Sequence, residues 1–214
     1  MFRVVDTDTL PLTAAQSEVW TAQHLLGDRR DFVITLLVEV TGVVDLARVR
    51  DAVRTTLMDA EALHVRRDFS GEHPVQRPDL RDWDVDVVDL SGDDDPVAAA
   101  HAWIADDVAS ADVTGAGPLF RTALLVLADD HLFWHQRYHH GIVDGFGMSL
   151  IFNEVRARYV DPTRRTAADA WALGPLVESD RDYRSSPAFA VDKAFWTTQL
   201  IGAAEPPILL PDVP

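Results

Sequence analysis

The sequence has 214 residues, 47% of them hydrophobic and 25% charged, which is enough apolar material for one domain with a substantial core. Its formal net charge of −16 repels phosphate backbones, it has no cysteine for a disulfide or a thiolate metal site, and no stretch is apolar enough to span a membrane. Because its first residues also lack the layout of a secretory signal, we expect a cytoplasmic protein that binds neither nucleic acid nor membrane.

In the first half of the chain, two segments place apolar residues at helical spacing. Residues 13–26 open with Thr13, and residues 45–60 open with Asp45. Threonine and aspartate are both favourable N-cap residues, because their side chains accept a hydrogen bond from the first turn. These patterns predict two amphipathic helices.

Four other segments in the same half have the character of strands. Residues 32–42 are a β-rich apolar run that ends at a glycine, and we expect a buried strand there. Residues 62–71, which end in Ser-Gly, and residues 73–78 predict a hairpin with its turn at that pair. Residues 83–92 alternate polar and apolar side chains, which predicts an edge strand.

The second half opens with a helix and a pair of strands. We expect the helix over 93–110, where three aspartates precede Pro96 and suit a helix N-terminus. After a Gly-Pro turn, residues 119–140 contain two strands joined at Asp129-Asp130.

Two further helices are expected, over 147–160 and 188–200, before a Pro-rich stretch closes the sequence. Strands that alternate with helices predict an α/β sandwich built on a mixed sheet.

The segment "WHQRYHHGIVDGFGMSL", residues 134–150, contains the side chains best suited to chemistry. On a strand, His139 and His140 point to opposite faces, so one can be anchored in the core while the other reaches an open cleft. A neutral imidazole can accept a proton from an attacking amine or hydroxyl. Asp144 can orient an imidazole or pair with an arginine, and Gly145 lets backbone or substrate pass closely.

The residues alone leave other interpretations of this segment open. A metal site is disfavoured, because adjacent histidines on a strand diverge and no further His/Glu cluster has helical ligand spacing. A Ser/His/Asp hydrolase would need a Gly-x-Ser-x-Gly elbow, which the sequence lacks. A pair of hydrogen-bonded core histidines is the structural alternative to a general base.

The run HHGIVDG, residues 139–145, matches the HHxxxDG signature of the condensation domains of nonribosomal peptide synthetases, members of the chloramphenicol acetyltransferase-like superfamily. LTAAQSEVW at 12–20 resembles the family's opening motif, and FWTTQLIGAAEPPILLP at 195–211 resembles the segment that leads out of its first lobe. The order of the expected elements also fits. The sequence therefore resembles the N-terminal half of a condensation domain, which implies a chloramphenicol acetyltransferase-like lobe.

The sequence departs from the family pattern at three places. Glu18 stands where the opening motif usually has arginine, and the second motif is reduced to the run Glu61-Ala62-Leu63. Val143 precedes the aspartate, where a small residue is common. None of these departures removes a group that could transfer a proton.

Carried over by position, the resemblance gives each motif residue a role. His140 would be the catalytic histidine, which deprotonates or positions the α-amine of an acceptor as it attacks a donor thioester. Gly145 would keep a tunnel clear and offer backbone to the reacting carbonyl as an oxyanion contact. His139 and Asp144 would be mainly structural, with the aspartate paired to an arginine, often on the other lobe.

The resemblance also implies partners. Donor and acceptor would arrive on the phosphopantetheine arms of peptidyl carrier proteins, so this chain would bind no cofactor and no metal. We expect residues 1–205 to form the N-terminal lobe and 206–214 a linker toward an absent C-terminal lobe. A single lobe lacks half of the tunnel, so it should be weakly active or inactive alone. If Met1 is native, the donor is expected in trans, or the domain initiates a pathway.

Other functions compete with amide formation in natural-product and antibiotic biosynthesis. A superfamily acyltransferase would use His140 to activate a hydroxyl and form an ester from a CoA or carrier thioester. An epimerisation domain shares HHxxxDG, although the opening motif favours condensation. A non-catalytic module that recruits a carrier or another partner would be expected to lose the second histidine or the glycine, and both are present.

Overall fold

The computed structural model describes the chain over residues 9–26, 30–68, 74–79, 83–111, 118–167 and 170–203. The chain divides into two compact units, residues 1–177 and 178–214. The first unit contains the HHGIVDG motif.

A four-stranded sheet forms the centre of this unit, with its strands in the order β2-β7-β6-β5. Their bounds are Val33–Thr41, His131–His139, Phe120–Ala128 and Asp86–Asp89. β7 is antiparallel to both of its neighbours, whereas β5 is parallel to β6. The predicted mixed sheet is therefore confirmed, as are the edge position of the strand within 83–92 and the central position of the strand that ends in the motif.

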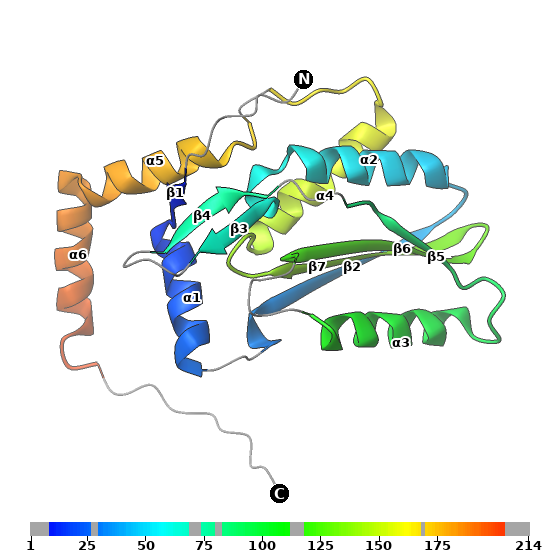
Figure 1. Ribbon diagram of the computed structural model, residues 1–214, viewed down its shortest axis with the longest axis horizontal. Coiled ribbons are helices and arrows are strands. Elements are labelled where there is room, and N and C mark those ends of the chain that lie inside the picture. The colour runs from blue at the N-terminus through cyan, green and yellow to red at the C-terminus, as the bar shows by residue number, and fades with distance from the viewer. Residues whose placement is uncertain are drawn as a thin grey trace, which may run out of the picture. The chain divides into compact units, whose positions relative to one another are not determined.

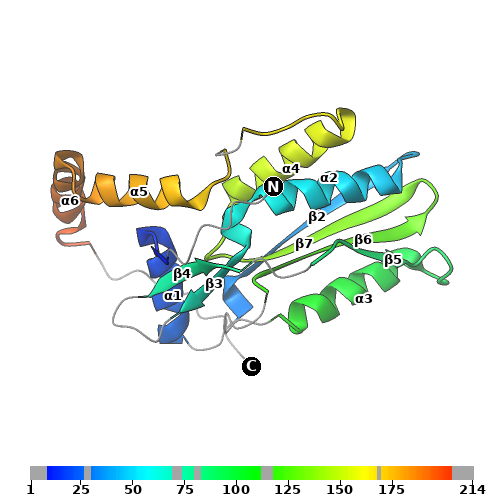
Figure 2. The ribbon, with the colours of Figure 1, turned by 45° about the horizontal axis from the view of Figure 1, so that its top comes forward.

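Helices cover both faces of this sheet (Figures 1 and 2). α3, Pro96–Ala109, packs on one face, and α2, Leu46–Asp59, lies with α4, Gly145–Val160, over the other. Successive residues of β6 enter different cores: Leu124 joins the cluster beneath α2 and α4, and Leu125 joins the cluster beneath α3. The helices predicted over 45–60, 93–110 and 147–160 are confirmed.

The prediction of a buried strand over 32–42 is wrong in one respect. β2 is an edge strand whose side chains alternate between half-buried and exposed positions. Leu37 is 37% exposed, so an apolar residue stands on the solvent side of the strand and hides the alternation in the sequence. Within the described chain, β2 pairs only with β7, which leaves the other side of its nine-residue edge open.

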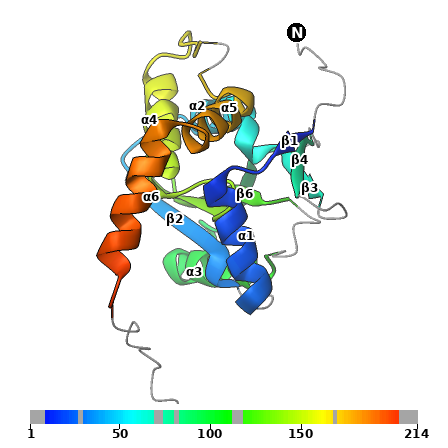
Figure 3. The same ribbon diagram turned by 90° about the vertical axis from the view of Figure 1, so that its left-hand side faces the viewer.

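A smaller sheet has the order β1-β4-β3, with bounds Leu10–Pro11, Val75–Pro78 and Val65–Asp68. β3 and β4 are antiparallel, which confirms the predicted hairpin, although its turn lies outside the described residues. β1 was not predicted. The sheet lies near the end of the central sheet at which β7 finishes (Figures 1 and 3).

The helix caps follow the sequence closely. Before α1, Ala14–Leu26, the Thr13 hydroxyl accepts a hydrogen bond from the Gln16 N–H at 3.2 Å. The Gln16 side-chain oxygen accepts the Thr13 N–H in return, at 3.0 Å. The Asp45 carboxylate accepts the Arg48 N–H at 3.0 Å, so both predicted caps are confirmed.

The remaining elements lie between these helices and in the last part of the chain. Two short 3-10 turns cover Arg30–Phe32 and Glu61–Leu63. α5, Leu173–Arg184, was not predicted, whereas α6, Pro187–Leu200, confirms the helix expected over 188–200. The stretch 206–214 lies outside the described residues, as does most of the Gly-Pro turn before β6. The boundary at residue 205 stays a prediction.

Candidate active site

The end of β7 places the two motif histidines in different surroundings. His139 is the last residue of the strand and only 2% exposed, whereas His140 begins the following turn and is exposed. The His139 N–H donates to the Leu119 carbonyl, and the His140 N–H donates to the Phe32 carbonyl, each at 2.7 Å. Chain segments next to both neighbouring strands therefore hold the backbone that carries the histidines.

The ring of His139 is fixed on both nitrogens. Its Nδ1 accepts the Gly141 backbone N–H at 3.0 Å, and its Nε2 lies 2.7 Å from the Gln23 side-chain oxygen on α1. Because a backbone N–H can only donate, Nδ1 carries no proton, and Nε2–H donates to Gln23. The ring also stacks on Trp20, with centroids 4.3 Å apart and planes within 5°. His139 is therefore a neutral, oriented imidazole.

Arg67, on β3, contacts the same turn. Its Nη2 donates to the Gly141 carbonyl at 2.5 Å, and its guanidinium carbon lies 4.1 Å from the centroid of the Trp20 ring. The side chain is buried, and burial lowers the pKa of Arg67 to about 9, so it remains a cation at neutral pH. Among the described residues, no carboxylate lies within ion-pair distance of this guanidinium, and its Nε and Nη1 have no hydrogen-bond partner.

Gly141 is enclosed by these side chains. A Cβ at this position would lie 2.6 Å from the Trp20 indole nitrogen and 3.1 Å from both Arg67 Nη2 and His139 Nδ1. Such contacts are too short for any larger residue without displacement of its neighbours. The third residue of HHGIVDG therefore has a packing reason to be glycine.

The other predicted site residues lie at an open surface. The imidazole of His140 makes no hydrogen bond to any described side chain or backbone group. Gly145 is the first residue of α4, and a Cβ there would have no atom within 4 Å. Asp144 is the N-cap of α4, and its Oδ1 accepts the Gly147 N–H at 2.7 Å. Asp144 forms no ion pair within the described chain, so its pairing with an arginine of another lobe stays a prediction.

The first turns of α4 continue this open surface with apolar side chains. Phe146 is 72% exposed, and Leu150, one turn further along, is 46% exposed. Residues four apart lie on the same helix face, so the two form one apolar strip beside the motif.

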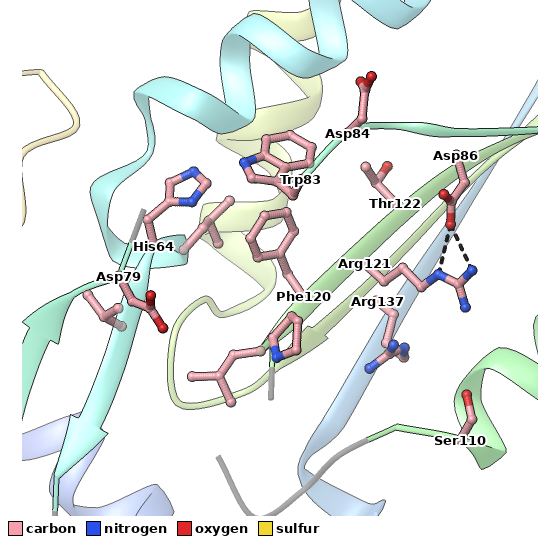
Figure 4. A pocket seen from close by; sticks show the side chains of 14 residues that line it. His64, Asp79, Trp83, Asp84, Asp86, Ser110, Phe120, Arg121, Thr122 and Arg137 are labelled. Atoms are coloured by element: carbon pink, nitrogen blue, oxygen red, sulfur yellow. Dashed lines mark hydrogen bonds and ion pairs between the residues drawn. The ribbon is translucent and has the colours of Figure 1, made fainter. Parts of the chain in front are cut away.

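A separate cavity of about 420 Å³ lies beside β6 and β7, with Arg121 and Arg137 among its lining residues (Figure 4). Leu119, whose carbonyl binds the His139 N–H, is part of its wall. Trp83 and His64 contact Phe120 there, with ring centroids 5.0 and 5.5 Å apart, each in an edge-to-face arrangement. None of His139, His140, Asp144 or Gly145 lines this cavity.

Beside the cavity, Asp107 of α3 is the centre of a buried charge cluster. Its carboxylate accepts hydrogen bonds from His135 Nε2 at 2.9 Å, Arg137 Nε at 2.8 Å and Arg121 Nη1 at 2.9 Å. Burial alone would raise the pKa of Asp107, but the hydrogen bonds from His135 and Arg137 outweigh it and hold the pKa well below its usual range. Arg121 also pairs with Asp86 (Figure 4). The cluster ties α3 to β6 and β7.

Neither a metal centre nor a membrane span is visible in the part of the chain that the structure describes. No three histidine or carboxylate side chains converge there in a way that could hold a metal ion. None of the described helices combines the length and the apolar character needed to cross a bilayer.

With this geometry established, comparison with known proteins identifies the family. The family model of the condensation domain matches residues 6–214. The chain belongs to the condensation-domain family. A dimodular nonribosomal peptide synthase of Bacillus subtilis (strain 168) is 35% identical over 201 residues, which cover 91% of this chain and 8% of that protein. Enterobactin synthase component F of Shigella flexneri is 33% identical over 196 residues, which cover 89% of this chain and 15% of that protein.

Solved structures agree with this assignment. A variant of the starter condensation domain of rhizomide synthetase, in complex with C8-CoA, aligns with a TM-score of 0.84 and 33% identity, over 95% of this chain and 48% of that one. The first condensation domain of the calcium-dependent antibiotic synthetase aligns with a TM-score of 0.78 and 26% identity, over 94% of this chain and 49% of that one. The predicted family and its α/β fold are confirmed, and this chain spans about half the length of the solved domains.

The side chains that hold the turn have no role that could be assigned from the sequence. Trp20 and Gly141 lay inside the two motifs, yet nothing in the sequence indicated that they touch. Gln23 follows Trp20 by one helical turn, which was a weak signal for a shared face. Arg67 gave no signal, because its partner Gly141 lies 74 positions further along the chain.

Proposed function

We propose that this condensation-family chain is the N-terminal half of a domain that forms an amide bond between a carrier-bound acyl or peptidyl donor and a carrier-bound aminoacyl acceptor. The observation that supports this most is the contrast between the two histidines. The ring of His139 is buried, neutral and bound on both nitrogens, whereas the ring of His140 is exposed and makes no hydrogen bond within the described chain. Of the two motif histidines, His140 is therefore the one whose imidazole can meet a substrate.

In the proposed reaction, the acceptor amine attacks the donor's thioester carbonyl, the carbon–sulfur bond breaks, and the donor's carrier leaves as a thiol. His140 positions the amine or accepts its proton as the carbon–nitrogen bond forms. Because aminolysis of a thioester is downhill, alignment of the two tethered reactants supplies much of the rate. Phosphopantetheine would deliver both reactants as substrate-borne arms.

The start of α4 supports the proposed role of Gly145. The first N–H groups of a helix have no intrahelical acceptor and carry a partial positive charge. Asp144 takes the N–H of Gly147, so the N–H groups of Gly145 and Phe146 remain for a developing oxyanion. The open space beside Gly145 leaves room for the substrate to approach.

A second half of the domain would complete the site. The solved relatives are about twice as long as this chain, and the strip of Phe146 and Leu150 leaves apolar surface uncovered beside His140. In α6, Phe195 and Trp196 are likewise more than half exposed. We propose that a C-terminal lobe and the carrier proteins cover these surfaces. The C8-CoA complex of the rhizomide starter domain supports an acyl thioester as the donor.

The test uses the complete condensation domain, meaning this chain with the second lobe that its relatives carry, and its loaded carrier proteins. Mass spectrometry of the carrier-bound product should show a new amide, and His140→Ala should lower its rate strongly. His101→Ala, at an exposed position on α3, is the matched control and should leave the rate unchanged.

Three outcomes would contradict parts of the proposal. Full turnover by His140→Ala would remove the general-base role of that histidine. Transfer to a hydroxyl acceptor in preference to an amine would favour an ester-forming acyltransferase. Carrier binding without any acyl transfer would favour a recruiting module.

A further inference from the structure

We infer that Arg67 is a positioning residue for the condensation reaction: its buried guanidinium holds the Gly141 carbonyl and thereby fixes the turn that presents His140. This inference rests on the proposed function, but its evidence is independent of the HHxxxDG signature. Arg67 lies on β3, in a different sheet from the motif.

Both peptide groups of Gly141 are bound by side chains. Its N–H donates to His139 Nδ1 at 3.0 Å, and its carbonyl accepts from Arg67 Nη2 at 2.5 Å. The residue directly before Gly141 is His140, whose own N–H donates to the Phe32 carbonyl. The backbone is therefore held before and after His140, while the His140 ring itself stays unbound.

Arg67 is placed in an environment that is unfavourable for a cation. Only 6% of the residue is exposed, and among the described residues no carboxylate pairs with its charge. Two of its three guanidinium nitrogens, Nε and Nη1, are buried with no hydrogen-bond partner in the described chain. Stacking on Trp20 offsets part of the lost hydration. A buried, uncompensated charge destabilises a fold, so stability alone does not account for arginine at this position.

The shape of the site fits an arginine closely. A Cβ at Gly141 would lie 3.1 Å from Arg67 Nη2, so the glycine makes room for the guanidinium. A planar guanidinium can face the Trp20 indole and donate to a carbonyl at its rim, whereas an ammonium cannot do both. The neighbouring Arg66 is exposed on the same strand, which makes it a matched control.

The experiment compares Arg67→Met, Arg67→Lys and Arg66→Met in the complete condensation domain, with kcat and KM for the acceptor carrier and the melting temperature measured for each. In Arg67→Met we expect kcat to fall by about tenfold or more, with KM within about twofold and the melting temperature equal or higher. Arg67→Lys keeps a charged donor and should recover part of kcat. Arg66→Met should match the wild type in all three quantities.

Other outcomes would overturn the inference. Wild-type kcat in Arg67→Met would show that the carbonyl contact has no part in the reaction. A lower melting temperature, or failure to fold, in both Arg67 variants would make the residue a structural one. Absence of amide formation by the wild-type domain would instead refute the proposed function, while the melting temperatures would still report whether the buried charge destabilises the fold.

Discussion

The indole of Trp20 and the imidazole of His139 are stacked face to face, with centroids 4.3 Å apart and planes within 5°. Trp20 belongs to α1, and His139 ends β7, so this contact joins the first helix of the chain to the strand that carries the motif. Arg67 lies over the same indole and binds the next turn. The opening motif and the HHxxxDG motif therefore form one packed unit.

The two adjacent histidines should respond to alanine in opposite ways. His139→Ala removes the stack on Trp20 and the hydrogen bonds to the Gln23 oxygen and the Gly141 N–H, which should cost about 3 kcal/mol of folding free energy. His140→Ala removes an exposed ring and should leave stability unchanged. Urea denaturation of both variants checks this, and an equal loss in the two would contradict the assigned surroundings.

Alanine should have different effects at the two glycines of the motif. In Gly141→Ala, the new Cβ would meet the Trp20 nitrogen at 2.6 Å, so we expect a loss of about 1–3 kcal/mol. In Gly145→Ala, the Cβ enters open space at the first position of α4, and stability should hold. If Gly145 keeps the substrate path clear, that variant should lose activity at an unchanged melting temperature. Normal turnover by Gly145→Ala would argue that the path tolerates a side chain.

Asp144→Ala removes the N-cap of α4. Loss of the hydrogen bond to the Gly147 N–H should destabilise the domain by about 1 kcal/mol, and Asp144→Ser, which can still cap, should restore most of it. Calorimetry of the two variants measures this difference. If Asp144→Ser keeps the melting temperature but loses activity, the aspartate has a second role besides capping α4. The predicted pairing with an arginine of the other lobe would be such a role.

The cluster around Asp107 should make the folding stability fall at acid pH. The pKa of Asp107 is held below that of an unfolded aspartate, about 3.9, so its contribution is present above about pH 5 and is lost as the pH falls through the native pKa. Asp107→Asn should lower the free energy of unfolding at pH 7 by about 3 kcal/mol, because His135 and Arg137 lose their anion. The difference in the free energy of unfolding between Asp107→Asn and the wild type should become smaller below about pH 4. Chemical denaturation at a series of pH values measures this difference, and a difference that stays constant down to about pH 2 would contradict the prediction.

Elements could be predicted from the sequence where the local residue pattern agrees with the way the element packs in the fold. The caps at Thr13 and Asp45, the hairpin of β6 and β7, and the position of the motif after a central strand follow from residue spacing. β2 was misjudged because Leu37 is apolar on a solvent-facing position of an edge strand. Burial there depends on which strands are neighbours, and the sequence of one strand does not contain that information.

In the candidate site, too, some residues could be predicted from the sequence and others could not. The residues that face substrate in the proposal lie within one turn and could be named from the motif. The residues that hold this turn come from α1 and β3, and their contacts depend on tertiary packing. Arg67 in particular has no local pattern, since a charged residue on a short strand is normally expected at the surface.

The hydrogen bond between Gln23 and His139 joins residues 116 positions apart. Contacts of this span form only after most of the chain is available, and they slow folding because a large loop must close first. During synthesis, α1 leaves the ribosome long before its partner strand exists. The imidazole of His139 can therefore be held by Gln23 only after the chain has been synthesised at least as far as β7.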